Sequence, residues 1–433
     1  MNILIAGASG LIGRRLATEL RLRGHMLTYV VRSTQELEQM RKAGERCVCM
    51  DFAVVPDKHA WLPALQNIDV AINAVGIFKE SGTQSFEAIH KRAPIEFFRA
   101  CAAANVAYVI QLSALGADTE ARSAYHLSKR AADDYLRGLP LNAAIIQPSL
   151  VYAPEGQSSQ FFLMLASMPL LFLPGGGQQE IQPVHVQDVV VGIANLVEQE
   201  ATGIQTLAFT GARPVTLQGY LALLRHGMGL GRQLVMAVPM GLARLFASFM
   251  SRFLKSFIDP ESLEMLERGN TAPNTSFAEV LGYSPQDPAD FIPAADAGAA
   301  LRKSLLNWGM PALRYSLAVV WIWTGIVSLW LYPVEMSYAL LAQTGLTGER
   351  ASLALYGAGA LDLVLGIATL ALARRFRPQL WLAQFVLISI YTLIISVQLP
   401  EFWLHPYGPV LKNLPMLAAL LVLWTFDSRR EGR

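Results

Sequence analysis

The chain has 433 residues, of which 53% are hydrophobic and 16% are charged, and its formal net charge is +2. Soluble domains carry about 25% charged residues, so this composition excludes a disordered chain and indicates a membrane portion. The small net charge, without a Lys/Arg block among aromatic residues, gives no support to nucleic-acid binding. The three cysteines (Cys47, Cys49 and Cys101) are too few for a disulfide framework, and no metal site is predicted.

Residues 1–299 alternate short apolar runs with segments of helical period. This alternation predicts repeated βα units, and therefore an α/β Rossmann domain with a doubly wound parallel sheet. The predicted strands are Asn2–Ala6, Met26–Val31, Cys47–Met50, Val70–Ala74, Ala107–Leu112 and Ala143–Ile146. Since no basic and apolar signal segment precedes the first strand, we expect this domain to lie in the cytosol.

Residues 300–433 are far more apolar and predict an all-α transmembrane bundle of four helices. A bilayer is crossed by roughly 17–25 residues, and the predicted spans are residues 315–334, 351–373, 379–400 and 409–426. Lysine and arginine residues precede the first span, join the second to the third and follow the fourth. By the positive-inside rule, and because the number of spans is even, we expect both termini on the cytoplasmic side of the inner (cytoplasmic) membrane.

The first predicted strand runs into three glycines spaced for dinucleotide binding, in the segment N-I-L-I-A-G-A-S-G-L-I-G. Gly7 permits a tight turn, Gly10 lets the backbone approach a pyrophosphate, and Gly13 allows a helix to pack closely on the strand. The N-terminus of that helix supplies N–H donors and a positive dipole. The residues predicted to contact the cofactor here are Gly7, Ala8, Ser9, Gly10, Leu11, Ile12 and Gly13.

The second predicted strand ends in Arg32 and Ser33 instead of the acidic residue typical of NAD-preferring proteins. An arginine at this position pairs with a 2′-phosphate, so NADP(H) is favoured over NAD(H) as the cofactor. Arg14 or Arg15 is expected to assist from the first helix. The other residues predicted to line the cofactor follow later strands and are Asp51, Phe52, Asn73, Ala74, Gly76 and Pro148.

The candidate catalytic residues are Ser113, Tyr125 and Lys129. Tyr125 and Lys129 lie four residues apart in S-A-Y-H-L-S-K, which places both side chains on one helical face. Because a neighbouring ammonium lowers the pKa of a tyrosine, Tyr125 is predicted to exchange a proton with substrate, while Lys129 also binds the nicotinamide ribose. Ser113 ends the fifth predicted strand and is expected to polarise a substrate oxygen.

Residues 1–299 resemble the short-chain dehydrogenase/reductase superfamily, in its extended or atypical branch, through G-A-S-G-L-I-G, N-A-V-G, Y-H-L-S-K and Q-P-S-L-V-Y. The segments S-A-L-G-A-D and Q-P-V-H-V-Q-D-V are most similar to relatives of the NADPH-binding accessory subunit of respiratory complex I. Residues 313–433 resemble the DoxX-like four-helix membrane proteins through W-I-W-T-G-I-V-S-L and L-K-N-L-P-M-L-A. The first resemblance implies a Rossmann fold, NAD(P) binding and use of the Tyr–Lys pair.

Two functions of different classes remain open. The first is a membrane-anchored NADPH-dependent oxidoreductase that transfers a hydride to a hydrophobic carbonyl or quinone-like substrate. The second is a non-catalytic NADPH-binding accessory or assembly protein of a membrane redox complex. A nucleotide-sugar epimerase or dehydratase is third, and Arg32 disfavours it because those enzymes typically retain NAD. The expected partners are therefore a hydrophobic small molecule or quinone, the lipid bilayer and a membrane redox complex, without nucleic acid.

Four further features carry hypotheses. Asp188 is expected to cap a helix over Val189–Glu198, and His185 faces the substrate cleft or is a structural histidine. Leu242–Ile258 has apolar residues at steps of three and four, which predicts a helix lying against the membrane surface or packed on its own domain. Asp362 lies midway along the second span. It is expected to form either a proton or quinone-headgroup site or an interhelical polar contact. Its expected hydrogen-bond donors are Thr324, Ser389, Tyr391 and Thr392.

Overall fold

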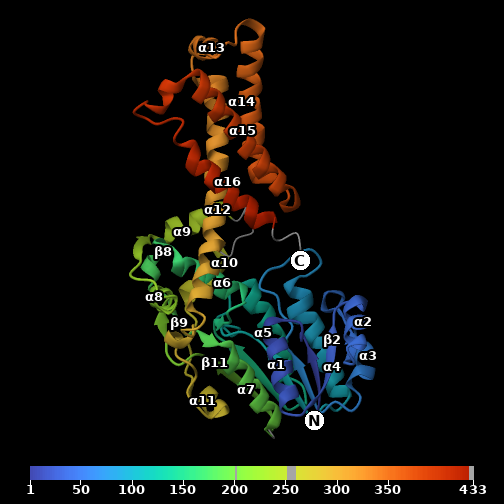
Figure 1. The fold of residues 1–433 in the computed structure, drawn as a ribbon. Helices are drawn as coiled ribbons and strands as arrows, with labels where there is room; N and C mark the ends of the chain where they lie inside the picture. The colour runs from blue at the N-terminus through green and yellow to red at the C-terminus, as the bar shows by residue number, and fades with distance from the viewer. Residues whose placement is uncertain (200–201, 251–259, 429–433) are drawn as a thin grey trace. The chain divides into compact units, whose positions relative to one another are not determined.

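Seven short strands of the N-terminal half form one parallel β-sheet (Figure 1). The computed structural model describes residues 1–199, 202–250 and 260–428. The strands lie in the order β11 (Ile204–Phe209), β6 (Ala143–Pro148), β5 (Tyr108–Leu112), β4 (Val70–Asn73), β1 (Asn2–Ala6), β2 (Met26–Val31) and β3 (Arg46–Cys49). The order reverses between β4 and β1, and such a switch point is where nucleotides bind at the carboxyl ends of parallel strands.

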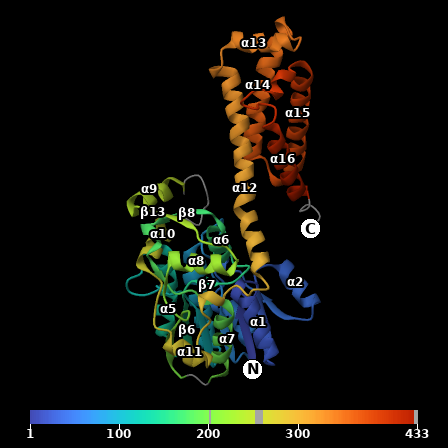
Figure 2. The same ribbon diagram turned by 60° about the vertical axis from the view of Figure 1, so that its left-hand side comes forward.

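Helices cover both faces of this sheet, and the central strand β1 is consequently buried on both sides, with Ile3, Leu4 and Ile5 inaccessible to solvent. One face carries α1 (Leu11–Leu22), α2 (Thr34–Lys42) and α7 (Val186–Glu198). The other face carries α3 (Lys58–Trp61), α4 (Ala93–Ala103) and α5 (Ala124–Arg137). The two layers of helices are visible on either side of the strands in Figures 1 and 2. This arrangement confirms the predicted doubly wound Rossmann fold.

All six predicted strands are present, and their ends differ from the prediction by no more than two residues. The seventh strand, β11, is absent from the prediction. It lies at the edge of the sheet, and only Leu207 and Phe209 among its six residues are buried. A short edge strand of mixed polarity gives a weak sequence signal, because its burial depends on a neighbour that is distant in the chain.

A smaller region packs beside the sheet, around the buried rings of Tyr152, Tyr220 and Phe291. Its strands form three pairs: β7 (Val151–Tyr152) with β10 (Val184–His185), β9 (Glu180–Ile181) with β12 (Val215–Thr216), and β8 (Leu170–Pro174) with β13 (Leu234–Val238). Its helices are α6 (Gln157–Ser167), α8 (Leu217–Gly227), α9 (Met240–Met250), α10 (Pro260–Arg268) and α11 (Thr275–Leu281). Helix α11 is tied to the main sheet, since the rings of Phe277 and Phe209 stack with centroids 4.1 Å apart.

The chain divides into two compact units, Met1–Ser304 and Leu305–Arg433, and the boundary lies within helix α12. The C-terminal helices are α12 (Ala297–Ile326), α13 (Val334–Gln343), α14 (Gly348–Ala371), α15 (Arg377–Gln398) and α16 (Asn413–Ser428). Among the residues that the structure describes, three helical segments are long and apolar enough to cross a membrane: Ala297–Leu331, Gly348–Ala371 and Arg374–Gln398.

Two of the predicted spans differ in their bounds from the helices found there. The helix assigned to 315–334 begins at Ala297, because hydropathy marks the apolar part of a helix and not its first residue. The segment 409–426 is helical only from Asn413, and its 16 residues rise roughly 24 Å, less than the roughly 30 Å of a bilayer core.

Glycines let α12 and α14 pack closely within the C-terminal unit. A Cβ on Gly325 would lie 2.7 Å from Leu363 Cγ, and one on Gly366 would lie 2.5 Å from Ile322 Cγ1. Gly359 and Gly366 are both buried and lie seven residues apart, on one face of α14. Backbones in lipid approach each other most closely where such small residues face one another.

Candidate functional site

The glycine turn after β1 has the geometry of a nucleotide-binding loop. Gly7 has a φ of +85°, and a Cβ there would lie 2.7 Å from the carbonyl carbon of Ala74. A Cβ on Gly13 would lie 2.1 Å from the carbonyl oxygen of Gly7, so only glycine lets α1 pack against the turn. Gly10 brings no side chain to the N-cap of α1, whose first turn also lacks an acidic residue. This helix end therefore fits a pyrophosphate.

The other residues predicted around the turn divide by burial. Ser9 is exposed, Ala8 is buried, and Leu11 and Ile12 pack against the core of the sheet. Leu11 and Ile12 therefore have their N–H groups, and not their side chains, to offer a cofactor. Arg15 forms an ion pair with Glu155 at 2.8 Å, which occupies its guanidinium.

At the end of β2, Arg32 is exposed and Ser33 caps the next helix. The hydroxyl of Ser33 accepts a hydrogen bond from Glu36 N at 3.2 Å, and the Glu36 carboxylate accepts one from Arg32 N at 3.1 Å. Ser33 and Glu36 thus form a helix cap, which positions the start of α2. The arginine predicted to pair with a 2′-phosphate consequently has a carboxylate one turn away.

The side chains predicted after β3 and β4 stabilise the loops themselves. Asp51 accepts a hydrogen bond from Ala53 N at 2.9 Å, and Phe52 is buried against the ring of Trp61. Asn73 is fully buried and donates to Gln111 Oε1 at 2.8 Å, while its Oδ1 accepts from Val75 N at 3.2 Å. The side chain of Asn73 therefore holds the turn after β4, and the backbone of that turn is what remains for a cofactor.

Tyr125, Lys129 and Asp133 lie on one face of α5, at successive steps of four residues. Lys129 is buried and donates to Leu112 O at 3.0 Å and to Val75 O at 3.4 Å, at the carboxyl ends of β5 and β4. A Cβ on Gly76 would lie 3.2 Å from Lys129 Nζ, so the predicted glycine contacts the lysine directly. The ammonium thus lies at the edge of the sheet where the glycine turn also lies.

Asp133 is a site residue that the sequence interpretation missed. It is fully buried, and one of its oxygens accepts a hydrogen bond from the hydroxyl of Ser113, while its Oδ1 has no partner among the described residues. Burial raises the pKa of Asp133 and lowers that of Lys129. Ser113 therefore donates inward to Asp133 in this structure, and its expected role toward a substrate oxygen stays a prediction. The four-residue step from Lys129 was the available signal.

Tyr125 differs from the expectation in its acidity. Burial, and then the charge of Asp133, raises its pKa to about 12. The ammonium of Lys129 is not among the causes, so the predicted lowering of the pKa is wrong for this arrangement. The phenol is consequently protonated at neutral pH.

His90 packs against the ring of Tyr125 and contacts Ser128, and in this way it orients the start of α5. Its Nε2 accepts a hydrogen bond from Ile77 N at 3.0 Å, so the ring proton is on Nδ1, which lies 3.1 Å from Ser128 Oγ. Ser128 Oγ in turn donates to Tyr125 O at 2.7 Å. Burial, and then the charge of Lys129, lowers the pKa of His90 to about 2, so the ring is neutral. Nothing in the local sequence E-A-I-H-K-R distinguishes this histidine.

Tyr125 lines a pocket of about 230 Å³ whose other walls combine apolar side chains with charged and polar ones. Its ring centroid lies 5.7 Å from that of Phe78, 5.9 Å from Phe86 and 5.4 Å from His90. The remaining lining residues are Lys79, Glu80, Glu261, Ser262 and Met265. Such a mixed lining accepts a molecule that has both an apolar and a polar part beside the phenol.

Helix α10 forms one wall of this pocket and is fixed at both ends. Glu261, near its start, accepts a hydrogen bond from Tyr125 N at 3.2 Å. Arg268, at its end, donates to both carboxylate oxygens of Asp118 at 2.6 Å and to Gly116 O at 2.9 Å. The loop after β5 and the start of α5 therefore position α10 over the phenol.

The N-cap of α7 is His185, and not Asp188 as predicted. His185 Nδ1 accepts from Gln187 N at 3.2 Å and is the N-cap of α7, and its ring packs on Tyr152 and Phe291. It is thus a structural histidine. Asp188 lies inside the first turn, where it accepts from Tyr283 Oη at 3.1 Å and Gln286 N at 2.8 Å, and is not the cap. The helix begins three residues earlier than predicted.

Asp362 in the C-terminal unit is buried, on the same face of α14 as Gly359 and Gly366. Its Oδ1 has no hydrogen-bond partner among the described residues. Two of its expected donors are used elsewhere, since Ser389 donates to Phe385 O and Thr392 to Ile388 O.

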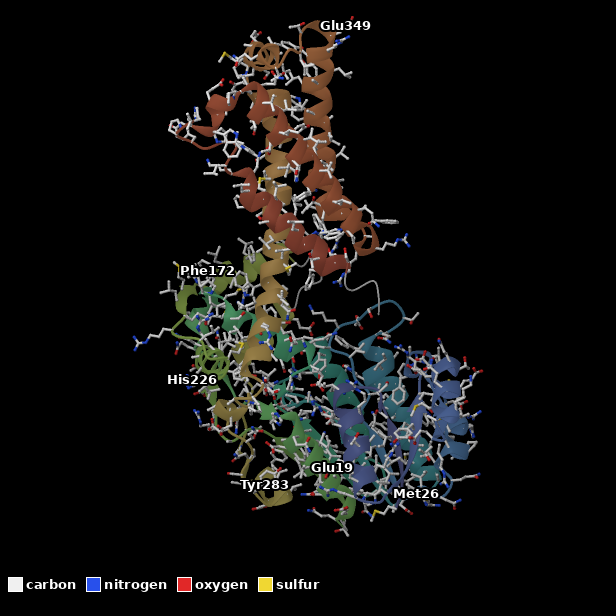
Figure 3. All side chains as sticks on the ribbon, viewed as in Figure 1. Glu19, Met26, Phe172, His226, Tyr283 and Glu349 are labelled. Carbon is white, nitrogen blue, oxygen red and sulfur yellow. The ribbon has the colours of Figure 1, made fainter. Side chains whose placement is uncertain are left out.

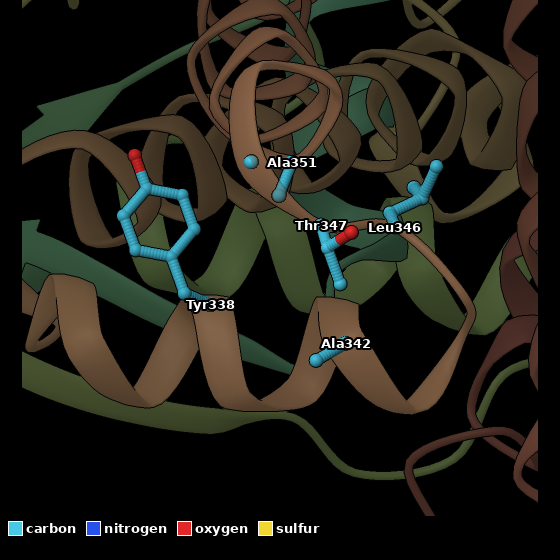
Figure 4. Close-up of a pocket in the computed structure, with 6 residues that line it drawn as sticks. Tyr338, Ala342, Leu346, Thr347 and Ala351 are labelled. Atoms are coloured by element: carbon cyan, nitrogen blue, oxygen red, sulfur yellow. The ribbon is translucent and has the colours of Figure 1, made fainter.

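A separate pocket of about 280 Å³ lies between α13 and the start of α14, beside Tyr338 and Thr347 (Figure 4).

Comparisons with known families agree with this division of the chain. Residues 7–193 match the NAD(P)H-binding family, and residues 318–421 match the DoxX-like family. The chain therefore carries an NAD(P)-binding Rossmann-like domain, followed by a DoxX-like domain.

Curated relatives match the N-terminal unit at low identity. NADH dehydrogenase (ubiquinone) 1 alpha subcomplex subunit 9 of Rattus norvegicus is 28% identical over 214 residues, which cover 48% of this chain and 56% of that protein. The match thus spans about half the length of that relative. Ceramide reductase of Caulobacter vibrioides is 24% identical, over 48% of this chain and 64% of the reductase. Photosystem II assembly factor Ycf39 of Synechocystis sp. is 21% identical, over 68% of this chain and 84% of the factor.

Among solved structures, a nucleoside-diphosphate-sugar epimerase from Staphylococcus aureus superposes with a TM-score of 0.55 at 15% identity. The match covers 67% of this chain and 99% of the epimerase. This likeness establishes the fold alone.

Proposed function

We propose that the chain is a membrane-anchored NADPH-dependent oxidoreductase that reduces a hydrophobic carbonyl or quinone-like substrate. The observation that supports this most strongly is Tyr125, a phenol that lines a partly apolar pocket one helical turn from the buried Lys129. The three bilayer-length helices provide the anchor. We further propose that the anchor lies in the inner (cytoplasmic) membrane with both termini on the cytoplasmic side, from the positions of the basic residues.

The residues of this chain have separate roles in the proposed reaction. The glycine turn and the N-terminus of α1 bind the pyrophosphate of the nucleotide. When NADPH is bound, it supplies the hydride. Lys129, already at the ends of β4 and β5, turns from carbonyl acceptors to the ribose hydroxyls. Tyr125 donates its proton to the substrate oxygen as that oxygen gains charge.

One relative favours a lipid substrate, and the pocket is compatible with one. Phe78, Phe86 and Met265 give the pocket an apolar part beside the polar Lys79, Glu80, Glu261 and Ser262, and its volume of about 230 Å³ accommodates part of a long molecule. The ceramide reductase of Caulobacter vibrioides is by its name an enzyme that acts on a lipid. We therefore propose a carbonyl carried on a long-chain lipid as the first substrate class to test.

A Tyr125→Phe variant tests the proposal, because it keeps the ring and removes the proton donor. The full chain in detergent is incubated with NADPH and a panel of long-chain carbonyls and quinones, and nucleotide oxidation is followed by absorbance. We expect turnover to fall by about 10²-fold or more while NADPH affinity is unchanged. Tyr135→Phe, nearly three turns further along α5, is the control and keeps full activity. Normal turnover in the Tyr125 variant would contradict the assigned role.

A second function is favoured by the printed roles of two relatives, a subunit of NADH dehydrogenase and an assembly factor of photosystem II. In that case the chain binds NADPH without turnover and stabilises a membrane redox complex. The same experiment separates the two functions. An accessory protein binds NADPH, oxidises it with none of the substrates, and is unaffected by Tyr125→Phe.

A further inference from the structure

We propose that the N-terminal unit binds the surface of the lipid bilayer through an exposed apolar face formed by β8, β13 and α9. This face adds a second membrane contact to the one made by the C-terminal helices. Its consequence for substrate entry rests on the proposed function, whereas the membrane contact itself does not.

The paired strands β8 and β13 expose one side of their two-stranded ribbon. Leu171 and Leu173 point into the protein and are 4% and 3% exposed. The alternate residues point outward, and the register places Leu170 beside Leu234 and Phe172 beside Met236. The exposed fractions of Phe172, Leu234 and Met236 are 57%, 72% and 53%. In Figure 3, Phe172 lies at the outer edge of the N-terminal unit.

Helix α9 follows β13 directly and exposes a second set of apolar side chains. Leu242, Leu245 and Phe246 are 57%, 68% and 61% exposed, and at 100° per residue they occupy an arc of roughly 100°. Ala247 is fully buried, so the opposite side of the helix contacts the protein. In residues 242–249, within the described part of the segment Leu242–Ile258, the apolar stripe is therefore exposed and does not pack into its own domain. Residues 251–258 of that hypothesis lie outside the described residues.

The strands and the helix are neighbours, since β13 pairs with β8 along its length and α9 lies beside β8 in both views (Figures 1 and 2). Together the side chains named above expose on the order of 700 Å² of apolar surface, more than the few hundred Å² common on soluble monomers. Such a face marks an interaction site, and its occupant has to be apolar.

The occupant that fits is a bilayer. The same chain carries three helices of bilayer length, so this unit is tethered to a membrane and meets lipid at a high effective concentration. An apolar stripe of leucine and phenylalanine with arginine off the stripe is the pattern of a helix that lies in the lipid interface. Arg244 follows this pattern, because it lies off the stripe and pairs with Glu267 of α10.

This face adjoins the wall of the candidate substrate pocket. Helix α10 packs against α9 through the Arg244–Glu267 ion pair, and its residues Glu261, Ser262 and Met265 line the pocket beside Tyr125. Contact of α9 with the bilayer would therefore place the pocket next to the lipid. If the enzyme reduces a lipid carbonyl, the substrate enters from the membrane without crossing water.

The test uses the full chain in phosphatidylcholine–phosphatidylglycerol vesicles that contain a lipid with a photoreactive diazirine near its glycerol end. After illumination, cross-linked peptides are identified by mass spectrometry. We expect lipid adducts on residues 170–174, 234–238 and 240–249 as well as on the C-terminal helices. Adducts confined to the C-terminal helices would overturn the proposal, as would a face covered by a second copy of the chain, because such a face gives no lipid adducts.

A pair of variants excludes chance labelling. Phe172→Asp together with Leu245→Asp places two carboxylates on the face, and we expect its lipid adducts to fall at least tenfold while those on the C-terminal helices persist. Leu22→Asp, at a leucine 80% exposed on α1, is the control and changes nothing. Retained NADPH binding shows that the double variant is folded. Adducts that persist on the face of that variant would refute the assignment, and this result does not depend on whether the chain has reductase activity.

Discussion

At the residue scale, His90 makes the stability of the N-terminal unit dependent on pH. Burial and the charge of Lys129 lower the pKa of the folded His90 to about 2, whereas the unfolded histidine titrates near 6.5. Below 6.5 the unfolded state therefore binds a proton that the folded state excludes. Stability is lost as the pH falls from about 6.5 toward 2.

We expect His90→Gln to reduce this acid sensitivity. Between pH 7.5 and pH 5 the titration costs the wild type about 2 kcal/mol, which the glutamine variant does not lose. Amide hydrogen exchange of β1 and β4 in both proteins at each pH measures the difference, because the intrinsic exchange rate cancels. Equal pH dependence in the two proteins would mean that His90 is protonated in the folded state.

Arg32 and Glu36 together predict the nucleotide preference. A charge-assisted contact of Arg32 with a 2′-phosphate is worth about 1.5–3 kcal/mol, so Arg32→Ala is expected to weaken NADPH binding tenfold to a hundredfold and to leave NADH binding unchanged. Glu36→Gln removes the nearby carboxylate and is expected to strengthen NADPH binding. Calorimetric titration of both nucleotides provides the measurement. Equal affinity of the wild type for NADPH and NADH would refute the preference.

The sequence identified those candidate site residues that are defined by their spacing along the chain. Tyr125 and Lys129 are one helical turn apart, and the glycine turn is continuous in sequence, so both were identified directly. Asp133 extends the same spacing and was available to the same reasoning. His90 and the contact of Ser113 with Asp133 depend on segments 20 to 38 residues apart in the chain, which no periodicity reports. The direction of the Tyr125 pKa was wrong because burial depends on tertiary packing.

At the element scale, the contact between α12 and α14 predicts that leucine substitutions at two glycines of α14 differ sharply in their effect on stability. A leucine at Gly366 would meet the side chain and backbone of Ile322, whereas Gly357 faces open space. We expect Gly366→Leu to destabilise the C-terminal unit by about 1–3 kcal/mol and Gly357→Leu to have little effect. Thermal unfolding of the full chain in one detergent compares them, and similar losses in both variants would show that α12 and α14 are not packed this way.

Two buried aspartates of the C-terminal unit are expected to respond oppositely to substitution. Asp427 accepts a hydrogen bond from Trp381 Nε1 at 2.9 Å, and Asp427→Ala leaves that buried donor unpaired at a cost of about 1–3 kcal/mol. Asp362 has an oxygen without a partner, so Asp362→Ala is expected to cost nothing or to stabilise. The same thermal unfolding decides. A large loss on substitution of Asp362 would favour the interhelical contact over a proton or headgroup site.

Element types were predicted better than element ends. The strands alternate with helices of clear period, and an apolar run of sufficient length identifies a bilayer-length helix. The start of α12 and the shortened α16 were not predicted, because hydropathy reports where a helix is apolar and helix ends depend on caps and prolines. The edge strand β11 was missed because its burial depends on its neighbour β6, which is distant in the chain.

At the scale of the whole molecule, the two compact units predict two separable responses to nucleotide. NADPH at a hundred times its dissociation constant stabilises the state that binds it by about 2.7 kcal/mol. We expect this protection in peptides of Met1–Ser304 and none in Leu305–Arg433, measured by hydrogen exchange with and without NADPH. NADH at the same multiple of its own constant is the control. Protection that extends equally into α14 and α15 would show that the units unfold together.

The central position of β1 has a consequence for biosynthesis. Its partners β2 and β4 follow it in the chain, and the unit closes only when Phe277 of α11 stacks on Phe209 of β11. A ribosome therefore releases almost the whole N-terminal unit before the first bilayer-length helix emerges at Ala297. During that interval the apolar strands are protected only by their own folding or by a chaperone. A variant that weakens the sheet would thus reduce the amount of chain delivered to the membrane, with unchanged activity per delivered molecule.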